Sequence, residues 1–326
     1  MYSNSLRRLL KRKRIEIGDR IKVEKNGKFY EGILMPRVMG DKDTVIIKLD
    51  NGYNIGLKSK KIELVSKAKK EKKRSKRKLE KDPKKPNITI LCMGGTIASR
   101  IDYRTGAVTP LSSAEDLIES IPELKEIANI EGREVELKLS ENLDFKDYKK
   151  LVREIEKEFK KDVDGIIITH GTDTLHYTAT ALSFAIKNPP VPIILVGSQR
   201  SSDRASSDGP MNLICAARFI TKTKFRDIGI CMHATESDNF CLIYPACKTR
   251  KMHTSRRDAF KTVNSRPWAL IFPEGEIRFL REKRENDEKT VIKNKFEEKV
   301  ALIKTYPNMD PKIIDFLTKN KSNGYG

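Results

Sequence analysis

NITILCMGGTIAS at residues 87–99 and DGIIITHGTDT at residues 164–174 are the two most informative stretches of this 326-residue sequence. Each opens with a short run of apolar, mostly β-branched residues, which is typical of a strand buried on both faces. The first run passes directly into glycine and then threonine, and the second does so after a single histidine. Parallel sheets bind ligands at the carboxyl ends of their strands, so these two ends are the first place to look for a site.

Strands and helices alternate along the chain after residue 86. The apolar residues within 144–160 recur at helical spacing and predict an amphipathic helix. The alternation predicts an α/β domain in three layers, a largely parallel sheet with helices on both faces. The other expected elements are strands at 191–198 and 227–233 and helices at 172–187 and 208–220.

Residues 15–65 follow a different pattern, in which short β-rich runs are separated by turn residues. Asn-Gly pairs at 26–27 and 51–52 stand between such runs, and this dipeptide is a strong signal for a β-hairpin. Four or five strands in so short a stretch predict a small closed β-barrel. We expect an accessory domain that binds or braces, preceded by a basic arm at residues 1–14.

Charge is concentrated in residues 66–86, a Lys- and Arg-rich linker with almost no apolar residues. Its composition is that of a tether, and two interpretations stay open, a phosphate-binding strap and a solvated spacer. The whole chain carries 66 Lys and Arg against 45 Asp and Glu, a formal charge of +21. This excess favours a polyanionic partner such as a nucleic acid.

Composition also limits the class of protein. The apolar fraction of 38% supports a substantial core, and no apolar run approaches the roughly 18 residues of a membrane span. The N-terminus has positive charge but no apolar segment of the kind found in a signal peptide, so we expect a soluble cytoplasmic protein. The five cysteines form no C-x-x-C pair, and we expect reduced thiols and no metal site.

Thr96 and Thr172 follow the glycines at the two strand ends. Exposed backbone N–H groups and a following helix suit a carboxylate or an oxyanion there. A threonine nucleophile needs a neighbouring base or cation, which Asp173 and a lysine within 248–261 could supply, although spacing does not select the lysine. Either threonine alone is more often a helix cap, and the two nearby histidines, at 170 and 176, are expected to be structural. The sequence contains neither a phosphate loop nor a dinucleotide fingerprint.

The motifs at 94–99 and 170–175 resemble the two signature motifs of the L-asparaginase family, in the family's order. Between them, IDYRTGAVTP at 101–110 is similar to the family's mobile lid. Downstream, SDGPMNL at 207–213 is similar to another of its runs, and RKMHT at 250–254 resembles its catalytic-lysine segment. This last match selects Lys251.

The resemblance implies roles for individual residues. One of the two threonines attacks a side-chain amide, and the choice between them stays open. The implied catalytic residues are Thr96, Thr172, Asp173 and Lys251, and the implied substrate-binding residues are Gly95, Tyr103, Ser140, Glu141 and Gly171.

Within that family the chain more closely resembles the D-type subunits of archaeal glutamyl-tRNA(Gln) amidotransferases. Residues 18–37 and 46–56 look like the added N-terminal domain of those subunits, and RKMHTSRRDAF at 250–260 looks like their version of the lysine segment. The resemblance implies a glutaminase that hydrolyses glutamine or asparagine and supplies ammonia for converting Glu-tRNA(Gln) to Gln-tRNA(Gln). The implied partners are the E-type subunit of the amidotransferase, a second copy of this chain within a heterotetramer, and the tRNA. The E-type subunit would use ATP and magnesium, and this chain would bind no cofactor.

By the same resemblance, residues 87–298 form an asparaginase-like catalytic domain. Residues 299–326 begin a smaller second domain, which we expect to be truncated, so that the chain is a fragment. Two other functions stay open, a free-standing L-asparaginase with an accessory barrel and a non-catalytic RNA-binding scaffold.

Overall fold

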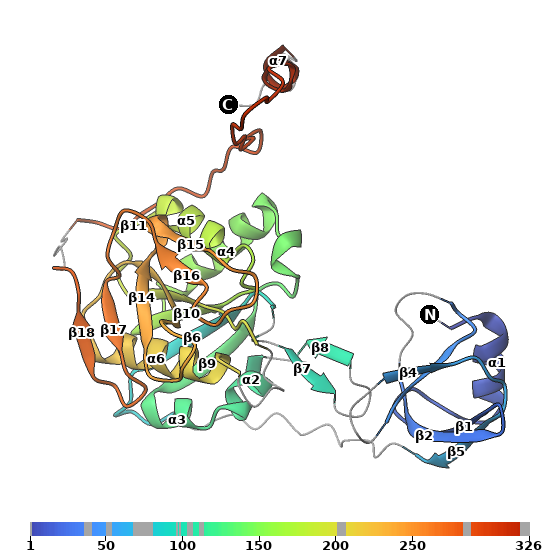
Figure 1. Cartoon of the computed structure of the whole chain (residues 1–326). Helices are drawn as coiled ribbons and strands as arrows, with labels where there is room; N and C mark the ends of the chain where they lie inside the picture. Colours follow the sequence, from blue (N-terminus) through green and yellow to red (C-terminus); the bar gives the residue numbers. More distant parts are fainter. Residues whose placement is uncertain are drawn as a thin grey trace.

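The computed structural model describes residues 2–35, 41–49, 54–67, 81–95, 97, 99–102, 107–110, 114–200, 207–282 and 288–319. These residues form a small N-terminal module and a larger α/β domain (Figure 1). Each of the two has a hydrophobic core of its own.

The N-terminal module is built on a five-stranded antiparallel sheet with the order β4-β3-β2-β1-β5. The turn between β1 and β2 is the predicted Asn-Gly pair, with φ of 52° at Asn26 and 73° at Gly27, as a tight hairpin requires. In the described residues β4 and β5 are the two edges of this sheet, so the pairing that would close the predicted barrel is not seen among them. The strands are β1 (Arg20–Lys25), β2 (Lys28–Leu34), β3 (Val45–Lys48), β4 (Asn54–Leu57) and β5 (Ile62–Ser66).

Helix α1 (Asn4–Arg12) packs on this sheet. Ser3 caps it by accepting a hydrogen bond from the backbone of Leu6, at 3.2 Å. Leu6 and Leu10 lie four residues apart, and both are buried in the core of the module. Residues 1–14 were expected to form a basic arm, but the helix within them is an integral part of the module, because one of its faces is apolar.

An eight-stranded mixed sheet forms the centre of the α/β domain, in the order β18-β17-β14-β13-β12-β10-β6-β9. Strands β13, β12, β10, β6 and β9 run parallel to one another. Strands β14, β17 and β18, at the other edge, pair antiparallel. The predicted largely parallel sheet is therefore confirmed, with an antiparallel edge that was not predicted. The strands are β6 (Asn87–Cys92), β9 (Asn129–Glu134), β10 (Gly165–Thr169), β12 (Ile193–Val196), β13 (Ile228–His233), β14 (Cys241–Pro245), β17 (Ala269–Ile271) and β18 (Ile277–Phe279).

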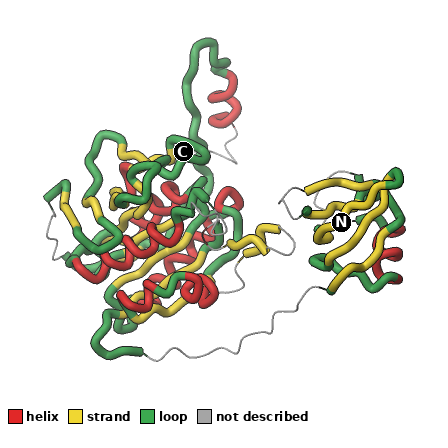
Figure 2. Tube along the Cα trace, turned by 60° about the horizontal axis from the view of Figure 1, so that its bottom comes forward, coloured by secondary structure: helices red, strands yellow, loops and turns green. Residues whose placement is uncertain are grey.

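Helices cover both faces of this sheet, as Figure 2 shows. Strand β10 illustrates the reason, because Ile167 belongs to one hydrophobic cluster while Ile166 and Ile168 belong to the other. One cluster includes residues of α2 (Ala114–Ser120), α3 (Glu123–Ile127) and α6 (Gly209–Lys222), and the other includes residues of α4 (Phe145–Glu158) and α5 (Leu175–Ala185). The three-layer arrangement follows from strands that are apolar on both faces.

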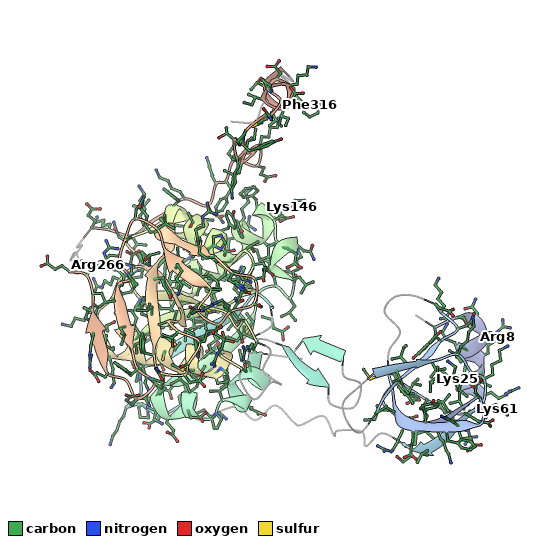
Figure 3. All side chains as sticks on the ribbon, viewed as in Figure 1. Arg8, Lys25, Lys61, Lys146, Arg266 and Phe316 are labelled. Carbon is green, nitrogen blue, oxygen red and sulfur yellow. The ribbon has the colours of Figure 1, made fainter. Side chains whose placement is uncertain are left out.

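Short elements complete the description. Helix α7 (Lys312–Lys319) carries exposed apolar side chains, among them Phe316, and lies away from the α/β domain in Figure 3. In the part of the chain that is described, no helix is long and apolar enough to cross a membrane. The remaining elements are β7 (Ser99–Asp102), β8 (Ala107–Pro110), η2 (Ser140–Asn142), β11 (Ile186–Lys187), η3 (Ala246–Lys248), β15 (Thr249–Lys251), β16 (Phe260–Thr262) and β19 (Val291–Ile292).

Candidate active site

The two strand ends singled out in the sequence lie side by side. Strands β6 and β10 pair in parallel with Cys92 opposite Thr169, so the loops that follow them leave the same edge of the sheet. Gly95 has a φ of 86°, and a Cβ atom there would lie 2.4 Å from the backbone nitrogen of Gly171. Glycine is required at this position for both reasons, since a side chain would be strained and would collide with backbone.

Gly171 in turn lies against Ser140, where an added Cβ would come within 2.7 Å of the serine Cβ. Ser140 is buried, and its carbonyl oxygen accepts a hydrogen bond of 2.7 Å from the Thr174 hydroxyl. Three predicted site residues therefore lie against one another, Gly95 against Gly171 and Gly171 against Ser140. Glu141 is exposed in η2, next to Ser140.

Lys251 joins this group from a distant part of the sequence. Its Nζ atom donates to Thr172 Oγ1 at 2.8 Å and to Asp173 Oδ1 at 2.8 Å. Strand β15 delivers the lysine and pairs Lys251 with Phe260, whose ring is fully buried. The lysine side chain is 8% exposed, whereas the Asp173 side chain is 64% exposed. The cation is therefore held inside, with a carboxylate on its solvent side.

This arrangement can stabilise a threonine alkoxide. The Thr172 side chain is buried, and the ammonium group of Lys251 points directly at its hydroxyl oxygen. A fixed positive charge in a partly dry site lowers the free energy of negative charge on that oxygen. Asp173 holds the ammonium group in place through the second hydrogen bond. Thr96 and Tyr103, the remaining predicted site residues, lie outside the described residues.

His170 and His176 are buried next to the site. His170 Nδ1 donates to the Gly171 carbonyl at 2.7 Å, and its Nε2 accepts from the Thr178 hydroxyl at 2.9 Å. Burial lowers the pKa of His170 to about 4. Burial, with the charges of Arg250 and Lys251, lowers the pKa of His176 to about 4 as well. Both imidazoles are neutral at pH 7, and His170 holds the loop that carries Thr172.

A buried polar network at the end of β12 and the start of α6 supports Thr172, and no role was predicted for it from the sequence. Asp208 accepts hydrogen bonds from the Ser198 hydroxyl at 3.0 Å and from the backbone of Gln199 at 3.0 Å. Asn212 donates to the Gly197 carbonyl at 3.0 Å. An added Cβ at Gly197 would lie 2.8 Å from Thr172 Cγ2, so the anchored loop packs directly on the threonine. The i, i+4 spacing of Asp208 and Asn212 at the start of a helix is the sequence signal from which this network could have been predicted.

The network continues toward the loop that follows Lys251. His233 Nδ1 lies 2.6 Å from Asn212 Oδ1, and His233 Nε2 lies 3.1 Å from Asp238 Oδ1. Arg257, six residues after Lys251, binds the same carboxylate. Arg257 lies within the RKMHTSRRDAF motif, which assigned it no role, and no sequence motif pointed to His233 or Asp238.

Candidate metal ligands do not cluster in the part of the chain that the structure describes, where no three or more His, Cys, Asp or Glu side chains gather as metal ligands would. The polar groups that the described part of the site does offer are hydroxyls, a lysine and a carboxylate.

Together, the mixed three-layer sheet and the Thr-Lys-Asp contact at its edge define an amidohydrolase domain of the asparaginase type. Residues 87–285 match the family described as "Asparaginase, N-terminal", and residues 15–66 match the "GatD N-terminal domain". The L-asparaginase of Thermococcus kodakarensis superposes with a TM-score of 0.65 at 29% identity, covering 72% of this chain and 68% of that one. A probable cytoplasmic L-asparaginase of Campylobacter jejuni gives 0.58 at 26% identity, covering 71% and 70%.

Relatives that match along most of this chain narrow the assignment further. The D-type subunit of glutamyl-tRNA(Gln) amidotransferase from Pyrococcus furiosus is 47% identical over 97% of this chain and 74% of its own length. The corresponding protein of Methanococcus maripaludis strain C6 is 44% identical over 95% of this chain and 75% of its own length. The chain belongs to the GatD family, the D-type subunits of glutamyl-tRNA(Gln) amidotransferases.

Proposed function

We propose that this chain is the glutaminase subunit of a tRNA-dependent amidotransferase. It hydrolyses the side-chain amide of glutamine, or of asparagine, and supplies the ammonia that converts Glu-tRNA(Gln) to Gln-tRNA(Gln). The observation that carries the proposal is the contact of Lys251 with Thr172 and Asp173, on a chain whose first 66 residues include the GatD N-terminal domain.

The reaction divides into two steps. The hydroxyl oxygen of Thr96 or Thr172 attacks the amide carbon. The bond from that carbon to nitrogen then breaks as the nitrogen gains the threonine proton, so ammonia is released and the acyl group remains bound to the threonine as an ester. Water then cleaves that ester and releases the free carboxylate. Lys251 stabilises negative charge at Thr172 Oγ1, and backbone N–H groups of the glycine turns at Gly95 and Gly171 hold the oxyanion of the tetrahedral intermediate.

The ammonia needs an acceptor, which this chain does not supply. In our proposal, the E-type subunit activates the glutamate on the tRNA with ATP and magnesium, and this chain binds no cofactor. The active assembly pairs two copies of this chain with two copies of the E-type subunit, and it works in the cytoplasm. Family membership supports a partner subunit and a tRNA substrate.

Ammonia release from glutamine by the purified chain, with and without the E-type subunit and Glu-tRNA(Gln), tests this function. We expect a low rate for the chain alone and a higher rate with both additions. The competing candidate is a free-standing L-asparaginase, favoured by the 29% identity to the Thermococcus kodakarensis enzyme. A high asparagine-hydrolysing rate that does not change when both are added would support that candidate instead.

A further inference from the structure

The positive charge of the chain is unevenly distributed. Residues 1–86 contain 28 of the 66 Lys and Arg residues and 11 of the 45 Asp and Glu residues, a net charge of +17 out of +21. The catalytic part that follows is close to balanced, with 38 basic and 34 acidic residues. Any polyanion attracted by the net charge is therefore attracted mainly to the first 86 residues.

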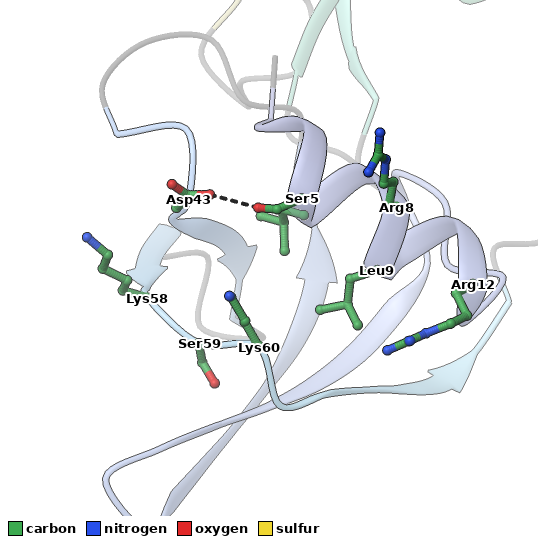
Figure 4. Close-up of a pocket in the computed structure, with 9 residues that line it drawn as sticks. Ser5, Arg8, Leu9, Arg12, Asp43, Lys58, Ser59 and Lys60 are labelled. Atoms are coloured by element: carbon green, nitrogen blue, oxygen red, sulfur yellow. Dashed lines mark hydrogen bonds between the residues drawn. The ribbon is translucent and has the colours of Figure 1, made fainter.

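A cleft of about 670 Å³ opens on the N-terminal module, between α1 and the segment that joins β4 to β5. Arg8 and Arg12 contribute from α1, one helical turn apart, while Lys58 and Lys60 contribute from the opposite side. Figure 4 shows Arg12 and Lys60 on opposite sides of the cleft, with Leu9 between them. The remaining lining residues are Ser5, Leu6, Asp43 and Ser59.

The cations of this cleft are available for an external anion. All four side chains are exposed, and within the described residues Arg8, Arg12 and Lys60 form no ion pair. Among the same described residues, Lys58 pairs only with Asp41, at 3.3 Å, with both side chains exposed to solvent. Such a pair contributes little and is easily exchanged for a ligand. The single carboxylate in the lining, Asp43, accepts a hydrogen bond of 3.2 Å from the Ser5 hydroxyl.

We propose that this cleft binds the phosphate backbone of the tRNA substrate, an inference that rests on the proposed function. Arginine and lysine side chains on the two sides of a groove suit successive phosphates. Further along the sequence, residues 66–86 carry 12 basic and three acidic residues. A net charge of +17 in the first 86 residues matches an extended polyanion better than a single acidic side chain of a protein partner.

The contact is with phosphates, so it is independent of base sequence and sensitive to salt. It would anchor the tRNA on this chain, at a site distinct from the glutamine site, and leave the choice of base sequence to other parts of the complex. The cleft thus acts on the affinity for tRNA and on the coupling of glutamine hydrolysis to the tRNA, not on the hydrolysis of free glutamine.

The test compares two double variants of the full chain that remove equal charge. Arg12→Gln with Lys60→Gln neutralises the cleft, and Lys25→Gln with Lys28→Gln neutralises the β1–β2 hairpin of the same module, outside the cleft lining. Binding of a fluorescein-labelled tRNA(Gln) transcript is measured by anisotropy at several salt concentrations, with the chain alone and with the E-type subunit bound. We expect the cleft variant to bind about 5- to 10-fold more weakly and to reduce the salt slope by about 1 to 2, while the hairpin variant changes binding less than about 2-fold.

Equal losses in the two variants would overturn the proposal, because they would show a response to bulk charge rather than to the cleft. Unchanged tRNA binding would also overturn it, and a cleft variant that no longer binds the E-type subunit would assign the cleft to an acidic protein surface. Hydrolysis of free glutamine is measured in parallel. If the parent chain does not hydrolyse free glutamine, the proposed function is refuted. If the cleft variant keeps glutamine hydrolysis but binds tRNA more weakly, the defect lies in tRNA binding and the proposed function stands.

Discussion

At the scale of single residues, Lys251 is the side chain on which the chemistry most depends. Its ammonium group lies 2.8 Å from both Thr172 and Asp173. Lys251→Met keeps the length and packing of the side chain but removes the charge, so we expect glutamine hydrolysis to fall by about 100-fold or more with little change in stability. Ammonia release measures the first and thermal unfolding the second. Lys248→Met, an exposed lysine three residues earlier, is the control and should keep parental activity.

Gly95 allows a second prediction at this scale. Gly95→Ala combines a strained φ with a Cβ 2.4 Å from the backbone of Gly171, so we expect it to lower the free energy of unfolding by about 2 kcal/mol or more and to impair activity. Gly27 has a φ of 73° but no heavy atom within 4 Å of an added Cβ. Gly27→Ala should therefore cost only about 1 kcal/mol, in the N-terminal module. Similar calorimetric shifts for the two variants would contradict the importance of the close approach.

His170 links the site to pH. Its pKa is lowered to about 4 in the folded protein from an ordinary value of 6.5, so the neutral ring is preferred on folding. As the pH falls from about 6.5 to about 4, the unfolded chain binds a proton that the folded protein does not, and stability falls by up to roughly 3 kcal/mol. Urea unfolding between pH 7 and pH 4.5 should show a shallower pH dependence for His170→Gln than for the parent. His253→Gln, at an exposed position, should follow the parent.

The sequence could not have established the Lys251 contact by itself. Lys251 and Thr172 are 79 residues apart, and several lysines near the same loop have equivalent spacing. The family resemblance selected this lysine, because a pattern of residue types carries no distance between remote segments. No role was predicted for His233 and Arg257 for the same reason, since their partners are brought near only by the folded sheet.

At the scale of elements, the sequence pattern predicted four of the five parallel strands and the helices α4, α5 and α6, but not strand β9 or helices α2 and α3. The helices expected at 144–160, 172–187 and 208–220 correspond to α4, α5 and α6, whose apolar residues recur at helical spacing. Strands β14, β17 and β18 were not predicted, because they are only three to five residues long and have little alternation. Helix α1 was not predicted, because the many basic residues around Leu6 and Leu10 gave the segment the composition of a charged arm.

The element that fixes the active-site edge is the pairing of β6 with β10. Their parallel register brings the turn at Gly95 against the turn at Gly171, and only the absence of side chains allows that approach. Both strands are apolar on both faces, so each is locked between the two helical layers. A site built on the ends of such strands is rigid, which suits chemistry that depends on a fixed lysine.

At the scale of the whole molecule, the separation of the cores has a measurable consequence. The core of the N-terminal module is drawn from residues 2–62, and the two clusters of the α/β domain are drawn from later residues only, so the two parts are expected to unfold in separate transitions. Leu10→Ala removes a buried side chain of the first core, and Leu213→Ala removes one of the second. Each should cost about 2 to 5 kcal/mol, but in a different part of the molecule.

Calorimetry of the full chain checks this prediction, together with glutamine hydrolysis below the lower transition. We expect Leu10→Ala to shift one transition only and to leave hydrolysis unchanged, because the described active-site residues all lie in the α/β domain. Leu213→Ala should shift the other transition and reduce activity as that transition is approached. A single transition that moves with either substitution would mean that the two cores are coupled, and the N-terminal module would then stabilise the catalytic domain as well as carry the proposed tRNA contact.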